Sequence, residues 1–272
     1  MTTSQTAVSS SFLRNKLPPF QRFITPLYFE FFSDDRPVNI TDSKPAPSNV
    51  VVEVHQSLEN VNCVWDACTI FCGYLIANSE SVFALCQPPG DVFRVLEIGS
   101  GSGLLGIVAL LALKPVCHRH NKQLQVCMTD LEEELDVIKQ TVAANFSELE
   151  SKPLVEALEW GSTEQYESLI LKLEGDELDV VLATDVVYEI QHFDLLFRTL
   201  KLLLRPNTLF IMAMERRWSD ITRFFWDDAK SYGFNYEMLP KSNVGDGPWW
   251  EMPHIDIYFI RKVIVETNDD VE

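Results

Sequence analysis

Short apolar segments alternate along the chain with longer segments whose apolar residues recur at helical spacing. Strands of four to eight residues, apolar on both faces, are predicted at 93–98, 125–129, 155–160, 179–184 and 208–214. Helices are predicted between and after them, at 104–113, 132–146, 192–204 and 218–232. Because such alternation builds parallel sheets through right-handed crossovers, we expect an α/β fold with an open, doubly wound, mostly parallel sheet.

Both ends of this pattern differ from its centre. FNYEML, from Phe234, and HIDIYFIRK, from His254, have strand composition with no helix between them, so they should pair antiparallel at the sheet edge. Upstream, VVVEVHQ from Val50 is typical of a strand and VWDACTIFCGYLIANS from Val64 of a helix. The sequence therefore predicts a seven-stranded, Rossmann-like sheet with an antiparallel C-terminal pair, in one domain over residues 50–263.

The two ends of the chain are predicted to lie outside this domain. Residues 1–49 form an N-terminal tail that ends in a proline-rich linker, DSKPAPSN, and residues 264–272 form an acidic C-terminal tail. An aromatic cluster in the first tail is expected to pack on the domain: Phe20, Phe23, Tyr28, Phe29, Phe31 and Phe32. The first 29 residues carry three basic residues and no acid, which fits a disordered lead-in better than the alternative, a mitochondrial transit peptide.

Charge and cysteine content narrow the class of protein. A formal net charge of -18 argues against binding nucleic acid by direct charge attraction; it favours a basic partner or serves only solubility. Six cysteines are spread through apolar segments without paired short spacings, which indicates buried, reduced thiols and no metal site. No uninterrupted apolar run reaches the ~20 residues that span a membrane. We expect a cytoplasmic or nuclear protein that does not bind a membrane, with the mitochondrion as the alternative location; its oligomeric state is left open.

A glycine-rich turn follows the first parallel strand, in FRVLEIGSGSGLLGI from Phe93. Its GSGLLG matches the G-x-G-x-x-G motif of dinucleotide-binding domains, so a dinucleotide-binding Rossmann domain is one interpretation of the turn. However, Glu97 lies at the carboxyl end of the strand, where its carboxylate should face the ligand crevice. A carboxylate there favours a cation or a hydrogen-bond donor and would not stabilise a pyrophosphate. A dinucleotide also needs a second βαβ half, whereas this chain closes with an antiparallel pair. The turn therefore points to another ligand.

Five motifs in order along the chain carry a family resemblance. They are VWDACTIFCGYL, VLEIGSGSGLLGI, MTDLEEELDVIKQTVAANF, ALEWG and ATDVVYE. The acidic glycine turn, the acid after the second strand and the closing antiparallel pair resemble the class I, seven-β-strand S-adenosylmethionine-dependent methyltransferases. The five motifs together resemble methyltransferase family 16, the non-histone protein-lysine methyltransferases marked by an Asp-x-x-Tyr motif. The resemblance covers roughly residues 50–262 and implies S-adenosylmethionine as cofactor and a protein substrate.

The resemblance assigns the first cofactor-binding residues. Glu97 and the backbone of Gly99 and Gly101 would contact the methionine part of the cofactor, and glycine lets the backbone approach a ligand closely. Asp130 would accept hydrogen bonds from the ribose hydroxyls. Its place at a strand end, 24 residues beyond Gly106, agrees with the usual offset of about 20. The alternative is that Asp130 caps the following helix.

The remaining assignments concern two tryptophans and the Asp-x-x-Tyr motif. Trp160 would border the adenine and Trp65 would close the cofactor pocket, although either could simply belong to the core. Asp185 and Tyr188 are expected to be the catalytic pair. Asp185 would orient the lysine ammonium rather than act as base, because a carboxylate raises the pKa of a nearby amine; the alternative is a turn cap. Tyr188 would steer the nitrogen with its hydroxyl and ring, and the proton would go to water.

The sequence thus favours an S-adenosylmethionine-dependent protein-lysine N-methyltransferase that acts on a basic site of a non-histone protein. The alternatives are an arginine, histidine or small-molecule methyltransferase on the same fold, or a non-catalytic cofactor-binding scaffold. The loop GDGPWWEMP, with Trp249, Trp250 and Glu251, is expected either to border the substrate entrance or to pack as a lid.

Overall fold

The computed structural model describes residues 27–31, 50–56, 63–147, 151–175, 177–217, 219–240 and 252–263. The acidic tail at 264–272, most of the tail at 1–49 and the loop residues Trp249, Trp250 and Glu251 lie outside the described residues. The predictions made for those segments therefore stay predictions, as do the domain boundaries.

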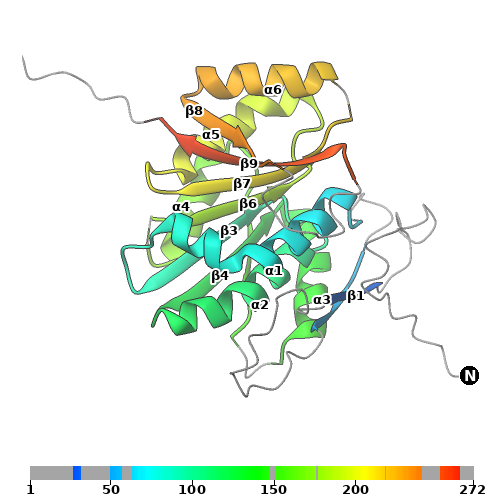
Figure 1. Ribbon diagram of the computed structural model, residues 1–272, viewed down its shortest axis with the longest axis vertical. Coiled ribbons are helices and arrows are strands. Elements are labelled where there is room, and N and C mark those ends of the chain that lie inside the picture. Colours follow the sequence, from blue (N-terminus) through cyan, green and yellow to red (C-terminus); the bar gives the residue numbers. More distant parts are fainter. Residues whose placement is uncertain are drawn as a thin grey trace, which may run out of the picture.

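A seven-stranded sheet forms the centre of the described structure, in the order β5-β4-β3-β6-β7-β9-β8 (Figure 1). The strands are β3 Val92–Ile98, β4 Gln123–Asp130, β5 Leu154–Ala157, β6 Val180–Thr184, β7 Leu209–Glu215, β8 Phe234–Met238 and β9 Ile255–Lys262. The helices are α1 Asp66–Cys86, α2 Leu104–Arg119, α3 Leu135–Asn145, α4 Thr163–Lys172, α5 Phe193–Leu203 and α6 Ser219–Ser231. Two short 3-10 helices, η3 Glu132–Glu134 and η4 Ile190–His192, precede α3 and α5.

The pairing of the strands confirms the predicted fold class. β3 pairs parallel with both β4 and β6, and β5 and β7 extend the sheet in parallel on either side. β9 runs antiparallel to β7 and to β8, as expected of the C-terminal pair. Because the chain moves from β3 to β4 on one side and later to β6 on the other, the carboxyl ends of β3 and β6 adjoin at a topological switch point, where open α/β sheets bind ligands.

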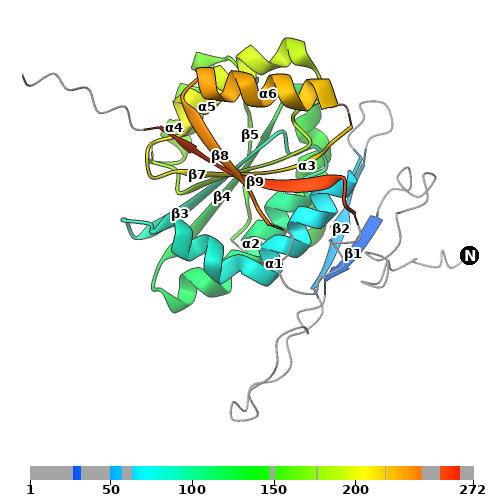
Figure 2. The same cartoon turned by 45° about the horizontal axis from the view of Figure 1, so that its top comes forward.

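Helices cover both faces of the sheet (Figure 2). On β3, Val95 packs in a buried cluster with α1 and α2, while the next residue, Leu96, packs in a second cluster with α5 and α6. The same alternation holds for Val180 and Val181 on β6. Strands that are buried on both faces need apolar residues at every position, which explains the unbroken apolar runs in the sequence.

Helix α1 is a long apolar helix of this core. By length and composition it is apolar enough to cross a membrane, with a mean hydropathy of 1.3 in an 18-residue window, yet 61% of that window is buried in the fold. A core helix passes the same test of length and composition, so this result is weak evidence for a membrane span. All six cysteines are buried and none forms a disulfide, as the sequence predicted.

A second, two-stranded sheet lies against α3. It pairs β1, Leu27–Phe31, antiparallel with β2, Val50–Val54. The side chain of Asn145, at the end of α3, accepts a 2.9 Å hydrogen bond from the Glu53 N–H and donates one of 2.6 Å to the Glu53 carbonyl. The segment expected to be a tail therefore contains a strand, and Phe29 of the aromatic cluster is buried in the core, as predicted for that residue.

Three elements differ from the predicted ones. Helix α4 was not predicted, and α2 continues well past residue 113 to Arg119, with Pro115 inside it. The strand expected at 155–160 ends earlier, at Ala157. The residues after Ala157 leave the ladder for a turn in which Gly161 has φ +89°, so Trp160 lies in the turn beyond the strand rather than at its end.

Candidate functional site

The turn after β3 is held against the end of β4. Gly99 and Gly101 have φ values of +63° and +53°, in the left-handed region that favours glycine. A Cβ atom at Gly99 would lie 3.0 Å from Cγ1 of Val186 and 3.7 Å from Cζ2 of Trp160. The Gly101 N–H donates a 2.7 Å hydrogen bond to Oδ2 of Asp130. The backbone of the turn is thus fixed at the carboxyl edge of the sheet, close to both Trp160 and Asp130.

Glu97 is a buried acid at this edge. It is 1% exposed, and its Oε2 atom has no hydrogen-bond partner among the described residues. Burial raises its pKa to about 8; the Ser100 hydroxyl and the Gly106 N–H oppose the rise, and the Asp130 charge adds to it. A buried carboxylate oxygen without a partner is costly unless the group takes up a proton or a ligand supplies a cation or a donor. Glu97 is therefore suited to an ammonium group.

Asp130 ends β4, and its carboxylate serves the backbone of two segments. Oδ2 accepts from Gly101 N–H and Oδ1 accepts from Leu131 N–H at 2.8 Å. The residues flanking η3 and α3 at their N-terminal ends are Leu131 and Glu134, so Asp130 does not cap the helix that follows. Burial raises its pKa, while the two backbone N–H groups oppose the rise. Each oxygen keeps a lone pair, so the carboxylate can still accept from a ligand.

The rings of Trp160 and Tyr188 both contact the ring of His192. The Trp160 and His192 rings lie 6.5 Å apart, and the Tyr188 and His192 rings lie 5.7 Å apart, both edge to face. Tyr188 is 42% exposed, so its ring is open to a partner. Burial of the hydroxyl, together with the acids Glu189 and Asp130, raises its pKa and keeps it protonated at neutral pH. Tyr188 therefore offers a hydroxyl donor and an accessible ring.

Asp185 follows β6 in a constrained conformation. Its φ of +52° lies in the left-handed region, which is unfavourable for a residue with a Cβ atom. Two hydrogen bonds to β7 hold it there: Asp185 N–H donates to the Ala213 carbonyl at 2.9 Å, and Glu215 N–H donates to Oδ1 at 2.8 Å. Such strain persists where the surroundings over-determine it, often at functional sites. Its carboxylate is thereby fixed in direction.

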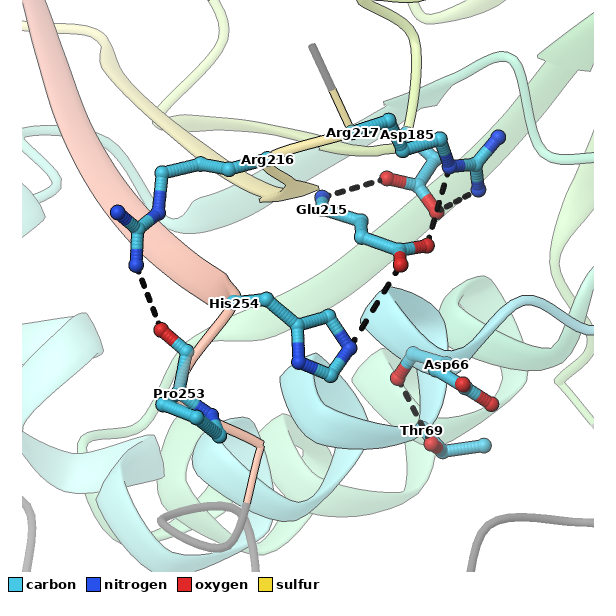
Figure 3. Close-up of polar contacts among 8 residues, drawn as sticks. All are labelled: Asp66, Thr69, Asp185, Glu215, Arg216, Arg217, Pro253 and His254. Atoms are coloured by element: carbon cyan, nitrogen blue, oxygen red, sulfur yellow. Dashed lines mark hydrogen bonds and ion pairs between the residues drawn. The ribbon is translucent and has the colours of Figure 1, made fainter. Parts of the chain in front are cut away.

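A residue that the sequence analysis did not single out, Arg217, binds this carboxylate (Figure 3). Its Nη2 atom lies 3.1 Å from Oδ2 of Asp185 and its Nε atom lies 3.0 Å from Oε2 of Glu215. Its guanidinium carbon lies 4.4 Å from the centroid of the Trp65 ring. The available signal in the sequence was a basic residue two positions beyond β7, the strand next to β6. Arg217 thus links the predicted acceptor residue, Asp185, to the predicted cofactor residue, Trp65.

Acids outnumber bases around Asp185. Burial raises the pKa of its carboxyl group, opposed by the Glu215 N–H and the Arg217 charge, while the charges of Glu215 and Asp66 add to the rise. His254 Nε2 lies 3.6 Å from Oε1 of Glu215 on the side away from Arg217 (Figure 3). A cationic ligand would therefore be favoured here over an anion.

The predicted site residues accordingly gather at one edge of the sheet. Glu97, Gly99, Gly101, Asp130 and Trp160 lie around the turn after β3, and Asp185 and Tyr188 follow the neighbouring strand β6. Trp65, just before α1, reaches the site through Arg217. What each residue binds stays a prediction. Among the described residues, no group of three or more histidine, cysteine, aspartate or glutamate side chains is arranged to hold a metal ion.

Comparison with known proteins identifies related chains. A family model described as "Lysine methyltransferase" matches residues 47–230. The chain is 29% identical over 179 residues to "EEF1A lysine methyltransferase 3" of Xenopus tropicalis, covering 66% of this chain and 68% of that one. It is 28% identical to "Protein N-lysine methyltransferase METTL21A" of Mus musculus, covering 65% of this chain and 72% of the relative.

A further relative is "Protein-lysine N-methyltransferase EFM6" of Saccharomyces cerevisiae, at 28% identity over 65% of this chain and 70% of that one. Among solved structures, human N-acetylserotonin methyltransferase in complex with SAM matches with a TM-score of 0.44 at 13% identity, over 73% of this chain and 55% of that one. The chain thus spans about half the length of that structure.

Proposed function

The chain belongs to the lysine methyltransferase family, and on that basis we propose that it is an S-adenosylmethionine-dependent enzyme that methylates a lysine side chain of a protein. The observation that carries the proposal is the fixed carboxylate of Asp185 at the switch point, three residues before the exposed Tyr188 and at the end of the strand next to the glycine turn. Lysine is favoured over arginine, histidine or a small molecule as acceptor because the related proteins are named for lysine.

The residues around the turn after β3 fit the cofactor. Glu97 has a buried oxygen without a partner among the described residues, which could accept a hydrogen bond from the cofactor's ammonium group. The left-handed backbone at Gly99 and Gly101 has no side chain to keep a ligand away. Asp130 has lone pairs left for hydroxyl donors, and Trp160 lies near Gly99 as a flat wall. Glu97, Gly99, Gly101, Asp130 and Trp160 would hold the cofactor.

When bound, S-adenosylmethionine supplies an electrophilic methyl group whose bond to sulfur breaks as the acceptor nitrogen forms its bond to that carbon. The protein's part is to orient the acceptor and exclude water. Asp185 would bind the lysine ammonium as it arrives, since opposite charges attract strongly where solvent is scarce. Tyr188 would direct the nitrogen with its hydroxyl and ring. The lysine then loses its proton to water, because Asp185 by itself favours the protonated amine.

The substrate class follows from the charges. A net charge of -18 and the acids near Asp185 favour a basic methylation site, because opposite potentials attract substrate to enzyme. EEF1A is the first candidate to test, since a relative is named for it. For the enzyme itself, a cytoplasmic or nuclear location agrees with six buried thiols that form no disulfide.

The proposal is tested by transfer of labelled methyl from S-adenosylmethionine into a cell extract supplemented with bacterially made EEF1A. The native chain and Asp185→Asn are compared, and the labelled amino acid is identified after hydrolysis. We expect one labelled protein, label in methyl-lysine, and at least a ~100-fold loss in the variant, because the fixed carboxylate is replaced by a neutral amide. Cofactor affinity, measured by calorimetry, should stay nearly unchanged.

Asp179→Asn serves as the matched control, because Asp179 is another buried acid whose Oδ2 accepts from a backbone N–H, that of Arg94, at the opposite end of the sheet. Label in arginine or histidine would keep the fold and change the acceptor. No label in any extract despite measured cofactor binding would favour a scaffold. A large loss of cofactor affinity in Asp185→Asn would move Asp185 into the cofactor site.

A further inference from the structure

Arg217 contacts three elements of the site that are far apart in the chain. Its guanidinium binds Asp185 after β6, binds Glu215 at the end of β7, and lies over the ring of Trp65 before α1. The side chain is 25% exposed, so its charge is only partly screened by water. An arginine held by two carboxylates and an aromatic face has a fixed position. The position of the charge is thus defined by the fold.

The other charged groups around Asp185 are mostly acidic. Asp66 begins α1 and its charge acts on Asp185, and Glu215 comes from β7. His254, just before β9, faces Glu215. The neighbouring Arg216 points away from Arg217 and donates to the Pro253 carbonyl (Figure 3). Its Nε atom also lies 2.6 Å from Oδ2 of Asp256. Of these two arginines, Arg217 is therefore the one whose charge faces Asp185 and Glu215.

An acceptor lysine placed at this cluster meets a conflict. The carboxylates attract its ammonium, but they also stabilise the protonated amine, which has no lone pair for the attack. Without Arg217 the lysine would meet the combined negative charge of Asp185, Glu215 and Asp66, and the arginine that opposes this charge at Asp185 would be missing. A guanidinium next to Asp185 reduces this stabilisation and repels the ammonium form, so it favours proton loss to water.

We propose that Arg217 is a positioning residue that holds the Asp185 carboxylate and offsets the surrounding acidic charge, so that the bound acceptor lysine loses its proton near neutral pH. The inference rests on the proposed function, because it takes Asp185 to face the acceptor. Arg217 acts through Asp185 rather than by contact with the reacting atoms. Asp185 keeps lone pairs for the lysine while it accepts from Arg217, so neither cation has to displace the other.

The experiment measures the single-turnover rate of methyl transfer against pH, with the acceptor protein that the labelling experiment identifies. This rate reports the titration of groups in the enzyme–substrate complex. In Arg217→Gln, which removes the charge but keeps a polar side chain, the pH at half-maximal rate should rise by about one unit. The rate at pH 7 should then fall about tenfold and recover at high pH. Arg217→Lys, which restores a charge, should keep the midpoint near that of the unchanged protein.

A second readout needs no substrate. With carboxyl-labelled aspartate, the NMR titration of Asp185, assigned with Asp185→Asn, should shift upward by about one unit in Arg217→Gln, because the arginine lowers the pKa of that carboxyl group. Arg216→Gln is the matched control. It removes the same charge one residue away, where the partner is Asp256. It should change the melting temperature but neither the pH at half-maximal transfer rate nor the NMR titration of Asp185.

The outcomes separate the two proposals. If the native chain methylates no lysine, the proposed function fails, whatever Arg217 does to Asp185. If it does so and Arg217→Gln lowers the rate equally at every pH, Arg217 has only a structural role and the inference is wrong. An unshifted Asp185 titration in a folded Arg217→Gln protein would contradict it as well. Should that variant not fold, an Arg217→Lys profile shifted to high pH would equally contradict it.

Discussion

The backbone N–H of Gly101 donates a 2.7 Å hydrogen bond to the Asp130 carboxylate, which joins the turn after β3 to the end of β4. The second oxygen of Asp130 accepts from Leu131 N–H, so one side chain organises two backbone segments. The residue predicted to bind the ribose therefore also shapes the turn predicted to lie beneath the methionine part of the cofactor. Substitutions at Asp130 should affect both at once.

Asp130→Asn should weaken binding of S-adenosylhomocysteine by about 10- to 100-fold, measured by calorimetry. An amide has one acceptor oxygen and places an NH₂ group opposite either Gly101 or Leu131, so one backbone donor loses its partner at a cost of about 1–3 kcal/mol. Asp136→Asn, an exposed acid in the first turn of α3, is the control and should bind as the unchanged protein does. Unaltered affinity in Asp130→Asn would remove Asp130 from the cofactor site.

Glu97 should make the stability of the cofactor-free protein fall as pH rises. Its pKa is about 8 in the folded state against an ordinary 4.5, so the folded protein retains a proton that the unfolded chain releases. Stability is then highest below pH 4.5 for this group and is lost through pH 8, at up to about 1.4 kcal/mol per unit. The measurement is urea unfolding at several pH values between 5.5 and 8.5.

Glu97→Gln provides the comparison for this pH dependence. Burial also raises the pKa values of Asp130, Asp179 and Asp185, so all of these act in the same direction and only the difference from the variant isolates Glu97. The glutamine variant should be less sensitive to pH. Parallel stability curves for the two proteins would show that Glu97 is ionised throughout this range.

Tyr188→Phe should lower the rate of methyl transfer by about tenfold, and Tyr188→Ala by more, because the first removes the hydroxyl and the second also removes the ring. The side chain is 42% exposed, so Tyr188→Phe should change the free energy of unfolding by less than about 0.5 kcal/mol. Tyr232→Phe, which removes a hydroxyl that binds Asp194 on α5, is the control. Equal rates for Tyr188→Phe and the native chain would restrict the role of Tyr188 to its ring.

Asn145→Ala should loosen the two-stranded sheet. The substitution removes both hydrogen bonds to Glu53 and should cost about 1–3 kcal/mol of stability. Val52 and Val54 pair with β1, and amide exchange at these two residues is expected to become faster by a larger factor than exchange in β3 or β6. Gln140→Ala, at an exposed position of the same helix, should leave exchange at Val52 and Val54 unchanged.

Sequence pattern was sufficient for the features that depend on strand order. Asp185 was expected beside the first parallel strand, and β6 does pair with β3, with Leu182 opposite Glu97. This worked because the carboxyl ends of parallel strands share one edge, so an acid or a glycine turn after each strand is brought to the same place. The position of a residue relative to the end of its strand is therefore enough to predict which residues lie close together, even when the side-chain contacts are unknown.

Features that depend on long-range side-chain contacts were missed. Arg217 is one of two adjacent arginines after β7, and only the fold shows that it faces Asp185 while Arg216 faces Asp256. Helix α4 was missed for a different reason. Its segment is mostly polar, but Ser162 accepts a hydrogen bond from Gln165 N–H, and a serine followed three residues later by glutamine is a helix-start signal present in the sequence.

Strand β1 could also have been predicted from the pattern of apolar and polar residues. LYFEF alternates apolar residues with a tyrosine and a glutamate, as a half-buried strand does, yet the proline-rich linker after it favoured a tail. Its partner β2 lies well downstream, and residues 32–49, which separate the two, lie outside the described structure. Pairing across so long a connection cannot be derived from local propensity.

The meeting of β3 and β6 at the centre of the sheet divides the site along the chain. The residues proposed to hold the cofactor around the glycine turn, Glu97 to Trp160, all precede α4, whereas those proposed for the acceptor, Asp185, Tyr188 and Arg217, all follow it. On these assignments, the part of the chain before α4 would bind the cofactor and the part after α4 would bind the acceptor. Exchange of the second part alone should therefore change the acceptor preference without changing the cofactor. The contact between Trp65 and Arg217 crosses this division, so an exchange of the C-terminal part of this chain should retain an arginine that can stack on Trp65.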